Sequence, residues 1–106
     1  MDEALIQEIT RKIVAAFNPR RIILFGSQAR GNARPGSDLD LFIEMETNLH
    51  PVERRSQVRR LLWPPPCAID ILVYTPREAE EHGRVLGTIA QTAQEHGTVL
   101  YERSRK

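Results

Sequence analysis

Over residues 3–17, apolar residues recur with the period of an α-helix. Apolar side chains recur at spacings of three and four, and charged or amide side chains occupy the positions between them. This pattern predicts an amphipathic helix over residues 3–17 with one face toward a core. Asn18-Pro19 predicts its end, because the residue before a proline disfavours helical dihedrals. The apolar positions are Leu5, Ile6, Ile9, Ile13, Val14 and Phe17.

Four short segments rich in apolar residues predict β-strands. They cover residues 21–25, 38–46, 68–74 and 99–101. The start of the second segment alternates, so Leu39 and Leu41 are expected on the core side of the strand. Asp38 and Asp40 are then expected together on the opposite, polar side.

Helices are predicted between these strands. Residues 51–63 predict one helix, which Pro64-Pro65-Pro66 stops. The segment Thr75-Pro-Arg-Glu78 predicts the start of another, with Thr75 as the N-cap and Glu78 completing a capping box. A further helical stretch is expected over residues 85–93. Helices that alternate with short strands predict an α/β layer fold in a single domain that spans residues 1–106.

Composition narrows the function. The chain has 106 residues, 41% of them hydrophobic, which is enough for one core. Its net charge is +1, which argues against a general polyanion binder, so RNA is not the expected partner. The single cysteine allows no internal disulfide. No apolar run approaches the roughly 20 residues of a membrane span, and no secretory signal is recognisable, so a cytoplasmic protein is expected.

A carboxylate pair follows a Gly-Ser turn. Gly26-Ser27 comes directly after the predicted strand 21–25, and ten residues separate it from Asp38-x-Asp40. Two aspartates two positions apart on a strand face the same way, with Cα atoms about 6.5 Å apart. Their charges repel by about 3 kcal/mol at an effective dielectric of 20. A divalent cation such as Mg²⁺ converts that repulsion into joint ligation.

Asp70 is expected to complete this site. It interrupts an otherwise apolar strand, where an unpaired buried carboxylate is costly. The cost is avoided if this strand lies beside the strand of Asp38 and Asp40 and all three carboxylates face two metal ions. Glycine at position 26 lets a phosphate approach the backbone, and the Ser27 hydroxyl can donate to phosphate oxygens.

Two arginines lie between the turn and the carboxylates. Arg30 is expected to neutralise triphosphate charge, whereas for Arg34 this role and a solvated position are equally supported. The arginine-rich stretch 53–60 is interpreted mainly as a solvated helix face, with partner or RNA binding as the alternative. Trp63 is either an exposed protein contact or a residue over the core, and the sequence does not separate the two.

The motif resembles a known family. Phe25-Gly-Ser-Gln-Ala-Arg-Gly31 through Gly36-Ser-Asp-Leu-Asp-Leu41, with a later strand aspartate at Asp70, is similar to the nucleotidyltransferase fold of the DNA polymerase β superfamily. It resembles in particular the minimal nucleotidyltransferases that pair with HEPN proteins in toxin–antitoxin systems. The resemblance implies a small mixed sheet flanked by helices.

The same resemblance implies an activity: an antitoxin that transfers AMP from ATP to a tyrosine of its HEPN ribonuclease toxin. It places Gly26 and Ser27 at the triphosphate and Asp38, Asp40 and Asp70 at Mg²⁺. Two alternatives stay open. The chain could neutralise a toxin by binding alone, or it could transfer the nucleotide to an RNA end or a small molecule. The sequence leaves the NTP and the oligomeric state open.

Overall fold

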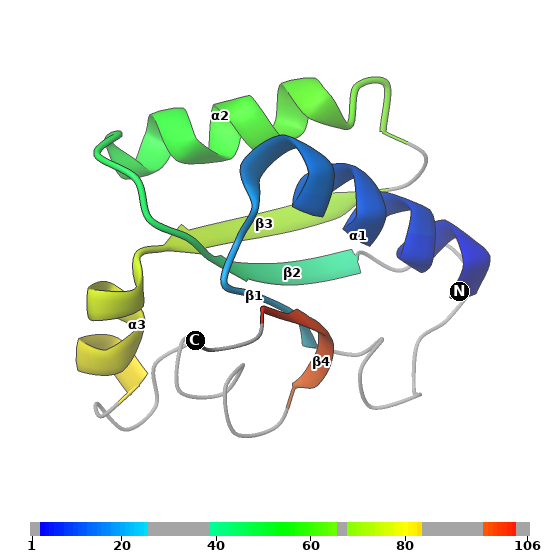
Figure 1. Ribbon diagram of the computed structural model, residues 1–106. Helices are drawn as coiled ribbons and strands as arrows, with labels where there is room; N and C mark the ends of the chain where they lie inside the picture. Colours follow the sequence, from blue (N-terminus) through cyan, green and yellow to red (C-terminus); the bar gives the residue numbers. More distant parts are fainter. Residues whose placement is uncertain (1–2, 26–38, 66–67, 84–96, 104–106) are drawn as a thin grey trace.

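The computed structural model describes residues 3–25, 39–65, 68–83 and 97–103. In these residues the strands form a four-stranded sheet with the order β3-β2-β1-β4. β1 pairs antiparallel with β2 and β4, while β2 pairs parallel with β3 (Figure 1). The elements are α1 (Glu3–Phe17), β1 (Arg21–Phe25), β2 (Leu39–Glu44), α2 (Pro51–Leu61), β3 (Ile69–Tyr74), α3 (Pro76–Gly83) and β4 (Thr98–Glu102). The predicted mixed α/β fold is confirmed.

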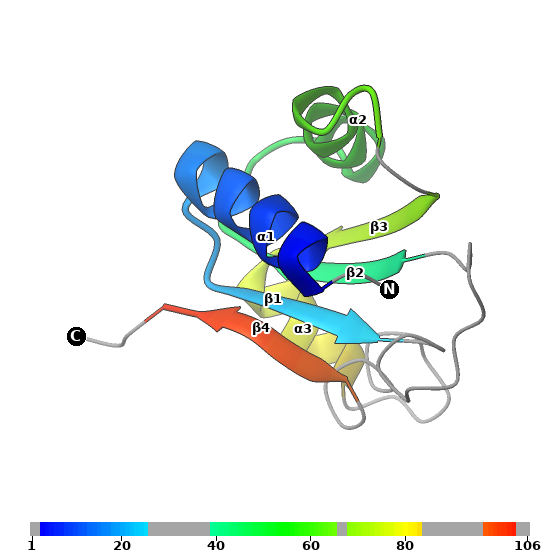
Figure 2. The ribbon, with the colours of Figure 1, turned by 90° about the vertical axis from the view of Figure 1, so that its right-hand side faces the viewer.

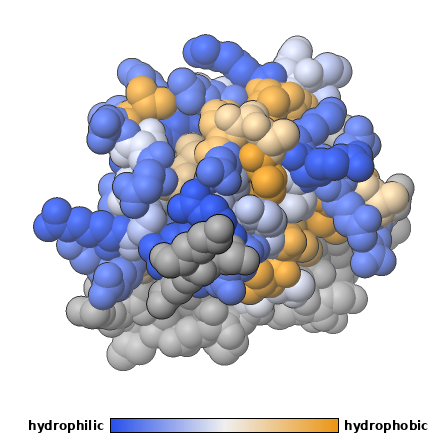
Figure 3. All heavy atoms as spheres, in the orientation of Figure 1, coloured by the Kyte–Doolittle hydropathy of each residue, from blue (hydrophilic) through white to orange (hydrophobic). Residues whose placement is uncertain are grey.

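Helices cover both faces of the sheet. α1 and α2 lie on one face and α3 on the other (Figure 2). Ile13 of α1 and Val58 of α2 belong to the larger core cluster, whereas Ala79 of α3 packs with Ile23 and Phe42 in a second cluster. On the face seen in Figure 3, hydrophilic side chains predominate among the coloured residues, with apolar patches among them. No helix in the described part of the chain is long and apolar enough to cross a membrane.

The first helix and strand match their predicted bounds. Ile9 and Ile13 are buried on the inner face of α1. The helix ends as expected before Pro19, where Asn18 takes a left-handed φ of 47° and its N–H donates to the Val14 carbonyl at 3.0 Å. Asparagine is one of the few residues that tolerate this conformation. The chain can therefore turn back at once into β1.

β2 is buried on both faces. Leu39, Leu41 and Ile43 face the larger core, as predicted. The opposite face was expected to be polar, but there Phe42 is fully buried and its ring lies 5.2 Å from that of Tyr74, centroid to centroid. The reason is the position of β2 between two other strands with α3 covering its second face. The strand ends at Glu44, two residues earlier than predicted.

α2 contains a buried arginine that the sequence interpretation missed. Arg54 belongs to the stretch expected on a solvated face, yet it is only 6% exposed. Its Nη1 donates to Glu78 Oε1 at 2.7 Å, and its Nε donates to the Leu49 carbonyl at 2.7 Å. The partner acid lies 24 residues away on α3, so local patterning could not reveal it. His50 caps the start of α2 by accepting from the Val52 N–H at 3.3 Å.

The capping box of α3 is confirmed. The Glu78 N–H donates to Thr75 Oγ1 at 3.2 Å, and the Thr75 N–H donates to Glu78 Oε1 at 2.9 Å. The predicted closing strand is also present as β4, which extends residues 99–101 by one residue at each end. The helix predicted over residues 85–93 lies outside the described residues.

Candidate active site

Asp40 and Asp70 are direct neighbours across two strands. In the parallel pairing of β2 with β3, the Cα partner of Asp40 is Asp70. Neighbouring strands lie about 4.8 Å apart, and residues directly opposite each other point to the same face of the sheet. The expectation that the Asp70 strand lies beside the Asp38–Asp40 strand is therefore confirmed.

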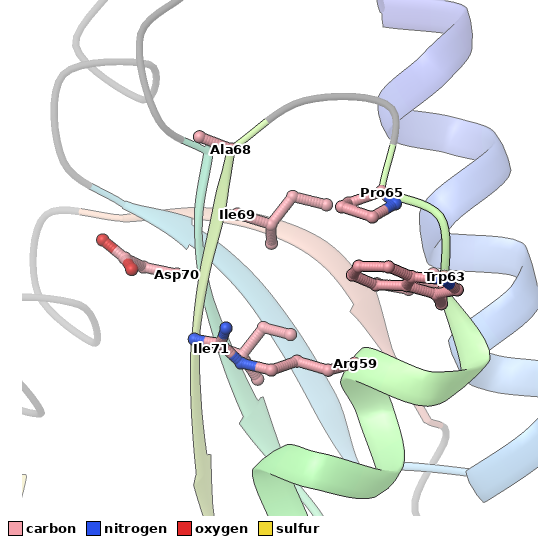
Figure 4. Close-up of a pocket in the computed structure, with 8 residues that line it drawn as sticks. Arg59, Trp63, Pro65, Ala68, Ile69, Asp70 and Ile71 are labelled. Atoms are coloured by element: carbon pink, nitrogen blue, oxygen red, sulfur yellow. The ribbon is translucent and has the colours of Figure 1, made fainter.

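The two carboxylates lie on the α3 face of the sheet. Leu39 and Leu41 flank Asp40 and belong to the core under α1 and α2, so alternation directs Asp40 the other way. Figure 4 shows the Asp70 carboxylate directed away from the side chains of Ile69 and Ile71. The same face carries Phe42 and Leu72 one step further along the strands.

The two aspartates differ in exposure. Asp40 is half-buried, whereas Asp70 is exposed at the beginning of β3. The sequence interpretation treated Asp70 as a buried carboxylate, and that premise was wrong. The reason is the strand order, because β3 lies at the edge of the described sheet and has β2 on one side only. An exposed carboxylate beside a half-buried one is open to a solvated ligand.

The end of β1 lies next to this pair. Phe25 is the antiparallel partner of Asp40, so Phe25, Asp40 and Asp70 follow one another across three strands. In the sequence, Gly26-Ser27 follows Phe25 directly and Asp38 precedes Leu39 directly. The end of β1 and the starts of β2 and β3 therefore lie together at one end of the sheet. In the sequence, the predicted phosphate turn follows the first of these, and the predicted carboxylates lie in or beside the other two. Gly26, Ser27, Arg30 and Asp38 themselves lie outside the described residues.

Asp40 and Asp70 suit a hard divalent cation. Carboxylate oxygens are the ligands that Mg²⁺ prefers, and one or two carboxylates with substrate phosphates commonly hold it. Within the described ranges, no group of three or more His, Cys, Asp or Glu side chains is placed to hold a metal ion. The described part thus supplies two of the three predicted ligands, and the third, Asp38, falls in the stretch 26–38.

A pocket lies beside the site on the other side of β3. It has a volume of about 290 Å³ and is lined by residues from the end of α2, the following loop and the start of β3 (Figure 4). Trp63 lines it and is 75% exposed. This answers the question the sequence left open, because Trp63 lies on the surface. The Trp-Pro-Pro-Pro run was the sequence signal for an unusual segment here, but it did not show that the start of β3 lines a pocket with it.

Comparison with known proteins identifies a family and solved structures of similar fold. The model of the "Nucleotidyltransferase domain" family matches residues 6–62, which include Gly26, Ser27, Asp38 and Asp40 but not Asp70. The crystal structure of a candidate nucleotidyltransferase from Sulfolobus solfataricus has a similar fold, with a TM-score of 0.67 and 21% sequence identity. That alignment covers 94% of this chain and 79% of the other. None of the curated proteins matches. Because the family model spans more than half of the chain, the protein belongs to the nucleotidyltransferase domain family.

Proposed function

We propose that the protein is a Mg²⁺-dependent nucleotidyltransferase that moves AMP from ATP to a hydroxyl group of a partner protein. The family uses nucleoside triphosphates and a divalent metal ion. The observation that carries the proposal is the direct pairing of Asp40 with Asp70 at the end of the sheet where β1 leads into Gly26-Ser27. Two like charges side by side repel each other, and joint binding of a cation relieves that repulsion.

In this proposal Asp38, Asp40 and Asp70 hold the metal ions, and Gly26, Ser27 and Arg30 hold the triphosphate. The acceptor oxygen attacks the α-phosphorus, the bond from that phosphorus to the β-bridging oxygen breaks, and pyrophosphate leaves. When bound, Mg²⁺ would stabilise charge on the attacking and leaving oxygens. Asp70, exposed on an edge strand, is accessible to an acceptor and can accept the proton that the hydroxyl loses.

We propose a HEPN-type ribonuclease as the partner and one of its tyrosines as the acceptor, so that the protein acts as an antitoxin. This part rests on the resemblance of the motif between Phe25 and Leu41 to the minimal nucleotidyltransferases. The exposure of Asp70 supports a macromolecular acceptor, because the carboxylate lies at the rim of the sheet where a tyrosine on another protein can reach it.

The test uses ATP labelled at the α-phosphate, Mg²⁺ and the co-purified HEPN-type protein. The expected result is label on that protein with the wild type and none with Asp38→Asn/Asp40→Asn. Glu46→Gln is the matched control, because Glu46 is an exposed acid beyond the end of β2. ATP labelled at the γ-phosphate should label nothing, which separates nucleotidyl from phosphoryl transfer.

Two results would contradict the proposal. If the double variant labels the partner as well as the wild type does, the metal-site assignment is wrong. A tight complex in which none of the four NTPs labels the partner would leave neutralisation by binding alone as the function.

A further inference from the structure

The pocket and the carboxylates lie on opposite sides of one edge strand. Ile69 and Ile71 line the pocket, and Asp70 between them also borders it, but its carboxylate is directed away from their side chains (Figure 4). A nucleotide whose phosphates lie at Asp40 and Asp70 would be on the α3 face and would not fill this pocket. Among the described residues, β3 has a partner strand on one side only, and a protein that reaches around its other edge can contact both sides at once.

The pocket combines an apolar floor with a large exposed aromatic side chain. Leu62 and Ile71 are buried in its floor, with 5% and 3% exposure. The Trp63 ring and Pro65 lie on the side of the pocket opposite Ile69 (Figure 4), and both residues are exposed. Tryptophan is enriched among the few residues that dominate binding energy at protein interfaces.

Positive charge borders the pocket. Arg59 lines it, and Arg55 and Arg60 are also exposed on α2. None of these three arginines takes part in the ion pairs of the described residues. Exposed arginines beside an apolar surface favour a partner with acidic side chains around an apolar anchor.

We propose that this pocket is the docking site of the acceptor protein, which inserts an apolar side chain against Trp63 and places acidic residues against Arg59. The inference rests on the proposed function and adds to it the surface that selects the acceptor. The apolar floor favours a protein over RNA, because RNA would use the arginines but not Leu62 and Ile71. Docking here holds the acceptor at the edge strand that carries Asp70.

Trp63 allows the docking to be observed directly, because it is the only tryptophan in the chain. The protein is labelled with 5-fluorotryptophan and its single ¹⁹F resonance is followed during titration. The HEPN-type protein should shift or broaden the resonance, whereas Mg²⁺–ATP alone and a single-stranded RNA oligonucleotide should not. A shift on dilution of the protein alone would show a second copy in the pocket and overturn the inference, as would a shift caused by the RNA.

Kinetics supply the second test. Trp63→Ala and Arg59→Glu should each raise the KM for the acceptor protein about tenfold, as expected for residues at the centre of an interface, and leave kcat and the KM for ATP unchanged. Val99→Ala is the matched control, since Val99 is an exposed apolar residue on β4, the other edge strand. Thermal unfolding of each variant checks that it is folded.

The outcomes separate this inference from the proposed function. Normal transfer with an unmoved ¹⁹F resonance and an unchanged KM would overturn the docking site and leave the activity standing. A shifted resonance without transfer would support the docking site and overturn the activity. If neither transfer nor a shift occurs, both are wrong.

Discussion

The guanidinium of Arg54 lies between α2 and α3 and binds the carboxylate of Glu78, with 2.7 Å from Nη1 to Oε1. The same nitrogen also donates to the Val73 carbonyl at the end of β3, at 3.3 Å. One buried side chain thus joins both helices to the strand that carries Asp70. Because it contacts the far end of β3 from Asp70, its role is to hold the layers together and not to take part in the chemistry.

Removing Arg54 should destabilise the fold. Arg54→Ala leaves the Leu49 and Val73 carbonyls without this donor and Glu78 without its cation, so we expect a loss of about 2–4 kcal/mol in the free energy of unfolding. Urea denaturation measures it. Arg77→Ala is the control, because that arginine is 88% exposed and its ion pair is with Glu81 on the same helix, and it should cost less than about 0.5 kcal/mol. Equal losses in the two variants would contradict the assignment.

The Arg54–Glu78 pair also predicts a dependence of stability on pH. The hydrogen bond from Arg54 lowers the pKa of Glu78 below its ordinary value of 4.5, against an opposing effect of burial. The folded state therefore binds that proton less readily than the unfolded state. The stabilisation is present above pH 4.5 and is lost as the pH falls through the lower pKa of the folded state.

The measurement compares the wild type with Glu78→Gln. The wild type should unfold at higher urea at pH 6, and the difference should shrink as the pH falls below 4.5. The Glu78 side chain is 36% exposed, so solvent screening should limit the contribution to about 1 kcal/mol or less. A difference that stays constant from pH 6 to pH 3 would show that ionisation of Glu78 is not the cause.

Phe42 supports the face of β2 on which Asp40 lies. It is fully buried and contacts Tyr74. Phe42→Ala should lower the free energy of unfolding by about 3–5 kcal/mol, because the cavity cannot fill without moving α3. Phe42→Leu keeps most of the volume and should cost less than half as much. Calorimetry of both variants checks the order, and a Leu variant as unstable as the Ala variant would contradict it.

Much of the fold could be predicted from local pattern. α1 was predicted to the residue, because its apolar spacing is regular and Asn18-Pro19 stops it. The capping box of α3 was visible because its two partners are three residues apart. The neighbouring position of β2 and β3 was predicted from the cost of burying Asp70 and is confirmed, although Asp70 is in fact exposed.

Other features depend on contacts that are distant in sequence. The register that sets Asp70 opposite Asp40 joins two strands that α2 separates in the sequence, so no local signal encodes it. The exposure of Asp70 follows from the position of β3 at the sheet edge. Which arginine of α2 is buried is decided by Glu78 on another helix.

The last prediction concerns the cation itself. Asp70 is exposed and its neighbour Asp40 carries the same charge, so without divalent cations Asp70→Asn should change the stability by less than about 0.5 kcal/mol or raise it slightly. With Mg²⁺ and a non-hydrolysable ATP analogue, the wild type should gain thermal stability, because a ligand that binds only the folded state stabilises it. Asp40→Asn and Asp70→Asn should lose most of that gain and at least about a hundredfold of the transfer rate. Differential scanning calorimetry with and without Mg²⁺ measures the first effect. If Glu46→Gln loses the gain while the aspartate variants keep it, the cation binds elsewhere.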